Sequence, residues 1–139
     1  MLILCTTDKR LCAKAEFYTK ESGIPIFLLT SPESLTITCL QEIFRREEAL
    51  SAPQKKRSMP QSVCIDLDSK EFLPEHLKDV VREISSVFPA VQILAFTLTL
   101  EPNTVQRAKL LGITQLLQRF SFEDLLKKLA GAWKEGLET

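Results

Sequence analysis

Five short apolar runs, separated by stretches with helical periodicity, constrain the fold of this chain more than any other feature. The runs lie at residues 2–6, 24–29, 62–67, 91–97 and 113–117, and each has the length of a typical strand. They are mostly unbroken by polar residues, which is typical of strands that are buried on both faces. Strands that alternate with helices in this way predict a doubly wound α/β fold, in which helices cover both faces of a five-stranded parallel sheet.

Capping residues predict where the first two helices begin and end. The first helix is expected to begin at Thr7 or Asp8 and to end at Gly23, and the second to begin at the serine-proline pair that starts at Ser31. The second helix and the polar, basic connection that follows it make an extended segment at about residues 41–61. Its prolines and clustered lysines favour a loop at the end of this segment.

The C-terminal half predicts three more helices. One covers residues 77–88 and ends at Pro89, and the next begins near Pro102. The last helix is expected to open with a capping box formed by Ser121 and Asp124. The side chains expected on its buried face are Leu125, Leu129 and Trp133.

Length and composition indicate one soluble domain over residues 1–139. A chain of 139 residues with 45% hydrophobic and 26% charged residues is sufficient for one core. The 18 basic and 18 acidic side chains cancel, which argues against nucleic acid or an anionic membrane as the partner. No apolar run approaches the ~18 residues that would span a bilayer, and no signal peptide is evident, so we expect a cytoplasmic location.

Cysteine and histidine usage excludes several kinds of chemistry. The four cysteines lie in apolar stretches without metal-ligand spacing, which indicates buried thiols in a reducing compartment. His76, the only histidine, has no Cys or second His at ligand spacing, so we expect it to face solvent rather than bind metal or act in acid-base chemistry. No Ser-His-Asp arrangement is recognised. The glycine-rich motifs that bind dinucleotides or nucleoside triphosphates are also missing.

Polar residues follow the ends of four predicted strands. In an open parallel sheet, ligands and reactive groups gather beyond the carboxyl ends of the strands, so these positions are the candidate site. The strand-end residues are Thr6, Thr7 and Asp8, then Asp66 and Asp68, then Thr97, and finally Gln118 and Arg119.

With these residues in this order, the chain resembles the CheY-like receiver domain of two-component response regulators over nearly its full length. The run Cys64-Ile65-Asp66-Leu67 is similar to the family's phosphoacceptor strand, and Leu94-Ala95-Phe96-Thr97 to the strand that ends in its switch threonine. Gly112 precedes the fifth strand, as in the family. The resemblance implies a flavodoxin/CheY-like sheet with strand order 2-1-3-4-5. It also implies Asp66 as the candidate phosphoacceptor, with Thr97 and Arg119 as candidate phosphoryl contacts.

Departures from the family pattern fall on the phosphorylation machinery. The family's acidic pair, which holds Mg²⁺, is replaced by Thr6 and Thr7, so that Asp8 is the nearest remaining acid. Neutral hydroxyls are poor replacements for the anionic oxygens that Mg²⁺ prefers. Arg119-Phe120 stands in place of the family's lysine-proline pair, and Leu116 in place of its switch aromatic. We therefore expect a degenerate receiver, or pseudo-receiver, that uses no cofactor.

The leading hypothesis is a noncatalytic signalling module, the regulatory domain of a bacterial signalling protein. It would bind a protein partner or form a homodimer through the fourth helix, fifth strand and fifth helix. A domain of this kind often precedes a C-terminal output domain, so 1–139 is compatible with being part of a longer protein. The candidate surface residues are Arg107, Leu116, Phe120 and Phe122.

Two other functions stay open at this point. The chain could be a working phosphoacceptor, with Asp66 phosphorylated by a histidine kinase in the presence of Mg²⁺. It could also be a flavodoxin-like small-ligand binder, with hydroxyls and amides of residues 6–9 at the ligand. Without phosphorylation, Asp66 would serve as a strand-end acid that is bonded to loop amides or paired with Arg119.

Overall fold

The structure alternates strands and helices in the order that the sequence predicts. The computed structural model describes residues 1–51, 61–69, 72, 74–113 and 115–138. The strands are β1 (Leu2–Cys5), β2 (Ile26–Leu29), β3 (Ser62–Asp66), β4 (Gln92–Thr97) and β5 (Gln115–Gln118). The helices are α1 (Lys9–Ser22), the short 3-10 helix η1 (Pro32–Ser34), α2 (Ile37–Ser51), α3 (Pro74–Val87), α4 (Pro102–Leu110) and α5 (Arg119–Glu138).

The five strands form one parallel sheet in the order β2-β1-β3-β4-β5. The predicted fold class and strand order are therefore confirmed. Cys5 pairs with Ile65 across β1 and β3, and Thr97 pairs with Gln118 across β4 and β5. This register brings the polar residues that follow β1, β3, β4 and β5 to one edge of the sheet.

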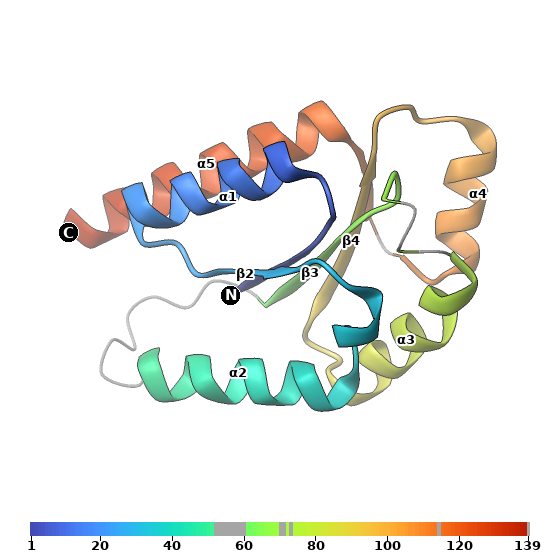
Figure 1. Ribbon diagram of the computed structural model, residues 1–139, viewed down its shortest axis with the longest axis horizontal. Helices are drawn as coiled ribbons and strands as arrows, with labels where there is room; N and C mark the ends of the chain where they lie inside the picture. Colours follow the sequence, from blue (N-terminus) through green and yellow to red (C-terminus); the bar gives the residue numbers. More distant parts are fainter. Residues whose placement is uncertain (52–60, 70–71, 73, 114, 139) are drawn as a thin grey trace.

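Helices cover both faces of the sheet, and each face has its own core. In Figure 1, α1 and α5 lie together on one side of the sheet, and α2 and α3 lie on the other. Strand residues alternate between the two cores: Ile3 and Cys5 of β1 belong to one cluster, and Leu2 and Leu4 to the other. All four side chains are at most 3% exposed, which explains why the strands are apolar without interruption.

The second helix begins later than the sequence predicts. Ser31 precedes η1, where its hydroxyl accepts a hydrogen bond from the amide of Glu33. The N-cap of α2 is Thr36, whose Oγ1 accepts a hydrogen bond from the amide of Cys39 at 3.2 Å. The prediction of a start at Ser31 is wrong, because the serine caps a single 3-10 turn and Leu35 is buried in the link.

Helix α5 begins at Arg119, two residues before the predicted capping box, and Ser121 is exposed. Its most deeply buried side chains are Phe122, Leu126 and Ala130, each at most 4% exposed. The predicted stripe of Leu125, Leu129 and Trp133 is only half-buried. The helix is therefore rotated from the predicted orientation, because Phe122 packs inward and stacks on Phe96 in β4, with ring centroids 4.1 Å apart.

The structure describes only part of the extended segment predicted at about residues 41–61. Helix α2 extends to Ser51, but the basic part of the predicted segment, residues 52–60, lies outside the described residues. Over the part of the chain that the structure describes, no helix is long and apolar enough to cross a membrane.

Gly23 ends α1 in the left-handed conformation, with φ of 74°, and its amide donates to the carbonyl of Thr19 at 2.9 Å. A Cβ there would lie 3.8 Å from Nε1 of Trp133, an ordinary contact. Gly23→Ala should therefore lower the free energy of unfolding by about 1 kcal/mol through backbone strain alone. Gly131→Ala is the control, because Gly131 lies inside α5 with open space around it.

We expect the control to raise stability by up to about 1 kcal/mol, since alanine is the better helix former. Urea unfolding measures both variants. A Gly23→Ala protein as stable as the wild type would contradict the left-handed cap.

Candidate functional site

The carboxyl edge of the sheet gathers polar residues from four segments of the chain. Thr6 and Asp8 follow β1, Asp66 ends β3, and Thr97 ends β4. Arg119 is the first residue of α5, directly after β5, so its side chain reaches back over the edge. The structure thus brings together most of the residues expected at the strand ends, whereas Gln118 is exposed at the end of β5.

Asp66 lies at the centre of this edge and is 1% exposed. Its Oδ2 accepts hydrogen bonds from Thr6 Oγ1 at 2.7 Å, from Ser69 Oγ at 3.1 Å and from Arg119 Nη2 at 2.7 Å. Its Oδ1 accepts one from the amide of Asp68 at 2.9 Å. A buried carboxylate needs such partners, and here both oxygens are engaged by the protein itself.

Arg119 joins three carboxylates. Its Nη1 pairs with Asp8 and its Nη2 with Asp66, and its Nε lies 3.9 Å from Oδ2 of Asp68. The guanidinium carbon lies 5.6 Å from the ring centroid of Phe96, within the range of a cation–π contact. Burial by itself would lower the pKa of Arg119, but Asp8 and Asp66 outweigh it and raise the pKa. We call Arg119 with Asp8, Asp66 and Asp68 the arginine clamp.

Asp8 has a second role as the N-cap of α1. Its Oδ1 accepts a hydrogen bond from the amide of Arg10 at 2.9 Å and a longer one, at 3.5 Å, from the amide of Leu11. Burial acts to raise the pKa of Asp8, but the bonds from Arg119 and from these amides lower it below its usual range. Because Asp8 already caps this helix end, its amides are engaged where the small-ligand alternative would place a phosphate.

Thr97 contacts Asp68 rather than Asp66. Its Oγ1 donates to Oδ1 of Asp68 at 2.8 Å, and the amide of Leu98 donates to Oδ2 at 2.7 Å. Thr97 is 5% exposed, so this hydroxyl is held inside the edge. The carboxylate of Asp68 thereby ties the end of β4 to the loop after β3.

Ser69 is a member of the site that the sequence analysis missed. Its Oγ donates to Asp66 and accepts hydrogen bonds from the amide of Thr7 at 3.0 Å and from Oγ1 of Thr7 at 3.1 Å. The signal was a hydroxyl three residues after a strand-end aspartate, a spacing that allows a local turn. Ser69 and the two threonines after β1 thus form a hydroxyl network that surrounds Asp66.

The residues present do not fit the Mg²⁺ that the receiver resemblance implies. Two neutral hydroxyls, from Thr6 and Thr7, stand where charged oxygens are needed. The remaining acids, Asp8 and Asp66, both direct an oxygen at the guanidinium of Arg119. No group of three or more His, Cys, Asp or Glu in the described residues has a metal-binding arrangement. In this site a guanidinium compensates the carboxylates.

The four candidate surface residues differ in exposure. Phe120 is 77% exposed and Arg107 is exposed, whereas Leu116 is half-buried against the core beneath α2 and α3. Phe122 is 1% exposed, so its assignment to the surface is wrong, because this ring stacks inside the core. The structure adds Leu98, 61% exposed, which follows β4 directly.

Arg107 also contributes to a cavity beside the arginine clamp. The cavity measures about 180 Å³ and lies between the end of β4 and α4. Its other lining residues include Asp68, Thr97 and Thr104. Its walls thus carry charge of both signs.

Comparison with solved structures identifies the fold. No protein-family model matches the chain, and no curated protein matches its sequence. A two-component response regulator from Legionella pneumophila is similar in structure, with a TM-score of 0.57, 16% identity, and coverage of 94% of this chain and 97% of that one. The signal receiver domain of NarL from Mycobacterium tuberculosis also has a TM-score of 0.57, with 13% identity and coverage of 96% and 94%.

A CheY-like receiver domain from Methanospirillum hungatei extends the comparison to nearly the whole chain. Its TM-score is 0.56 at 9% identity, and the match covers 99% of this chain and 95% of that one. The chain therefore has the fold of the CheY-like receiver domains, which is the fold that the sequence resemblance implied.

Replacing Arg119 tests the clamp. Arg119→Met removes the compensating charge from a buried carboxylate, so we expect the free energy of unfolding to fall by about 3 kcal/mol at pH 7. Lys14→Met is the control, since the Lys14–Glu123 pair between α1 and α5 is exposed and should contribute less than about 1 kcal/mol. Chemical unfolding measures both. If the free energy of unfolding fell by the same small amount in both variants, the result would contradict a stabilising role of the arginine clamp.

The cost of Arg119→Met should depend on pH. The folded pKa of Asp8 is lowered, so its contribution is complete above the unfolded value of about 3.9 and is lost as the pH falls through the lower folded value. The difference between wild type and variant should therefore be largest near neutral pH and should shrink below about pH 4. Unfolding curves at a series of pH values measure this. A difference that grows on acidification would contradict the pairing with Asp8.

Proposed function

We propose that this chain is a pseudo-receiver, a noncatalytic signalling module that acts by binding a protein partner or a second copy of itself. The observation that carries the proposal is the ion pair between Arg119 Nη2 and Asp66 Oδ2, at 2.7 Å with Asp66 1% exposed. The solved structures that share the fold support a role in signalling, since they are described as response regulators and receiver domains.

The clamp opposes phosphorylation of Asp66 for two reasons. Both oxygens of Asp66 already accept hydrogen bonds, three at Oδ2 and one at Oδ1, and such bonds lower the nucleophilicity of a carboxylate toward a phosphoryl group. Transfer to a carboxylate also depends on a metal ion that neutralises the charge on the phosphoryl oxygens, and the residues here do not suit Mg²⁺. Arg119 provides positive charge, but that charge is already directed at Asp8 and Asp66.

Exposed apolar side chains next to the clamp support a docking role. Leu98 comes directly after Thr97 in β4, and Phe120 comes two residues after Gln118 in β5. Thr97 and Gln118 are partners across β4 and β5, so the two apolar residues follow neighbouring strand ends. They are 61% and 77% exposed, so both large apolar side chains are accessible to a partner. With Arg107 on α4, they form the proposed docking surface on the side of α4, β5 and α5.

The cysteines agree with the cytoplasmic location that we propose. In the described structure all four are free thiols. Cys5 and Cys64 are buried, whereas Cys12 and Cys39, which the sequence predicts to be buried, are only half-buried. Burial raises the pKa of Cys64 to about 12. A buried neutral thiol acts as a small apolar side chain and needs no oxidising compartment. The module would pass its state either to an attached output domain or to a separate protein.

Phosphorylation provides the first test of the proposal. Incubation with acetyl phosphate and Mg²⁺ should add no phosphoryl group to the wild type, because Asp66 is engaged by Arg119. Mass spectrometry of the intact protein measures this, and a phosphorylatable receiver in the same reaction shows that the reagent is active. Stoichiometric labelling that Asp66→Asn abolishes would favour the phosphoacceptor alternative instead.

The docking surface is tested by paired substitutions of exposed rings. Phe120→Ser removes the most exposed apolar side chain beside the clamp, and Phe17→Ser removes one that is 58% exposed on α1. In the cells that produce the protein, crosslinking to the wild type should capture a partner that Phe120→Ser loses about tenfold or more and Phe17→Ser retains. Equal capture by the wild type and both variants would contradict the proposed surface.

A further inference from the structure

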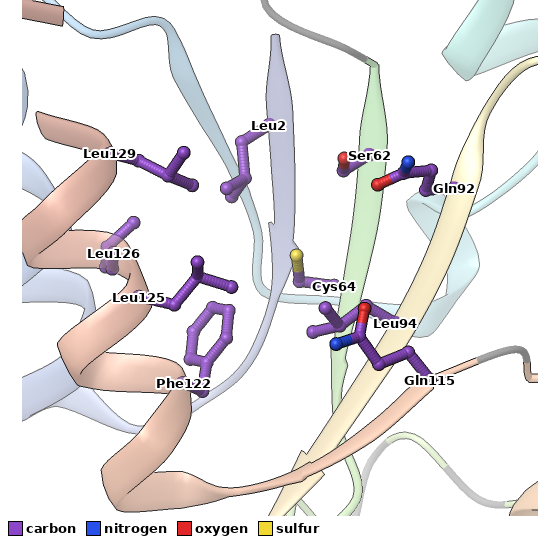
Figure 2. Close-up of a pocket in the computed structure, with 10 residues that line it drawn as sticks. All are labelled: Leu2, Ser62, Cys64, Gln92, Leu94, Gln115, Phe122, Leu125, Leu126 and Leu129. Atoms are coloured by element: carbon purple, nitrogen blue, oxygen red, sulfur yellow. The ribbon is translucent and has the colours of Figure 1, made fainter. Parts of the chain in front are cut away.

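A cavity of about 220 Å³ lies between α5 and the sheet (Figure 2). It opens beside the part of α5 that follows the first turn, on the face that α1 and α5 cover. Figure 2 shows Phe122 and Leu125 on α5 facing Cys64 and Leu94 on the sheet. The lining residues are Leu2, Ser62, Cys64, Gln92, Leu94, Gln115, Phe122, Leu125, Leu126 and Leu129.

The strand register explains how the floor of this cavity forms. Ser62 pairs with Gln92, while Cys64, Leu94 and Gln115 form one row across β3, β4 and β5. Because alternate strand residues share a face, both rows point toward α5. In the second row Cys64 and Leu94 are apolar and Gln115, on the edge strand β5, is polar. The other polar side chains, Ser62 and Gln92, lie at the start of β3 and β4.

The lining of the cavity is mainly apolar and carries no charge. None of its lining residues is ionic, and Ser62, Gln92 and Gln115 supply neutral hydroxyl and amide groups. A charged ligand would lose part of its hydration here without gaining a counter-charge, which disfavours its binding. A neutral molecule would keep its hydrogen bonds through the glutamines and bury its apolar part against the leucines. The volume is below the roughly 300 to 1,000 Å³ of sites for drug-sized ligands.

We propose that this cavity binds a small neutral amphiphile, with a short aliphatic chain against Cys64, Leu94 and Leu125 and a neutral amide or hydroxyl head between Gln92 and Gln115. The inference does not rest on the proposed signalling function. It assigns a ligand class to a cavity whose lining does not include Leu98, Arg107 or Phe120 of the docking surface.

An occupant of the cavity would touch the packing that supports the clamp. Phe122 lines the cavity and stacks on Phe96, with an angle of 3° between the rings. Phe96 in turn lies beneath the guanidinium of Arg119. A ligand against Phe122 is therefore separated from Arg119 by two packed rings. The backbone NMR signals of the clamp residues thus serve as a second readout of binding.

Hexanamide is the probe for the experiment, because it combines a five-carbon apolar tail with a neutral amide. Titration into the 15N-labelled full chain should give saturable shifts at Cys64, Leu94, Gln115 and Leu125, with a dissociation constant of about 1 mM. Hexanoate, which has the same tail and a negative charge, should bind at least about tenfold more weakly. No saturable shift, or equal binding of the two compounds, would overturn the proposal.

Two pairs of variants locate the site. Leu125→Trp fills the cavity from the helix and should abolish binding, whereas Lys127→Trp places the same ring on the exposed side of α5 and should leave it intact. Gln115→Leu changes an exposed residue of an edge strand, so it should fold even if Leu125→Trp does not, and it should weaken hexanamide binding about tenfold. Unchanged binding in Gln115→Leu, or shifts of these signals with protein concentration alone, would overturn the assignment.

Discussion

A buried carboxylate at the end of a central strand has to be compensated, and the rest of this edge is arranged around that requirement. Asp66 is 1% exposed. Burying a charged or polar group this deeply costs several kcal/mol of folding free energy unless the protein supplies hydrogen bonds or an opposite charge. Two hydroxyls, one amide and one guanidinium supply those bonds. Among these partners only the guanidinium carries charge, so Arg119 is the one that provides a counter-charge to the buried carboxyl group.

The same contact determines where the last helix starts and how it is oriented. Arg119 is both the first residue of α5 and the clamp residue, so the helix begins where its side chain can reach Asp66 and Asp8. One turn later Phe122 faces inward and stacks on Phe96. Since Asp8 caps α1, the clamp also connects the two helices that share a face of the sheet, and an exposed Lys14–Glu123 pair joins them farther along.

The fold could be predicted from the sequence because its signals are local. Unbroken apolar runs specify buried strands, and Asp8 and Gly23 bound α1 through bonds within their own turns. The orientation of α5 could not be predicted, because Leu125 and Leu129 repeat with the same spacing as Phe122 and Leu126. The choice between these two stripes is made by the ring of Phe96, a contact with a distant strand.

The sequence predicted most of the residues that lie at the site, but not the hydrogen bonds that they form with one another. Most of the residues that meet at the sheet edge could be identified from their positions at the predicted strand ends, since parallel strands end side by side. Ser69 was missed because its role depends on the loop geometry that turns its hydroxyl toward Asp66. Thr97 was a candidate phosphoryl contact in the phosphoacceptor alternative, and the bond that its hydroxyl makes to Asp68 could not be read from the sequence. The cavity under α5 also left no sequence signal, because the residues that form it are set by strand register.

A guanidinium differs from a divalent metal in a way that matters for signalling. A bound Mg²⁺ is exchangeable, so a site that depends on it can be filled or emptied, and its charge is available to a phosphoryl group. Arg119 is covalently part of the chain, and its two terminal nitrogens, Nη1 and Nη2, are already engaged by Asp8 and Asp66. The compensation of Asp66 is therefore independent of ion concentration and of a phosphoryl donor. A module built in this way would have to receive its input elsewhere, through a protein at the docking surface or a molecule that contacts α5.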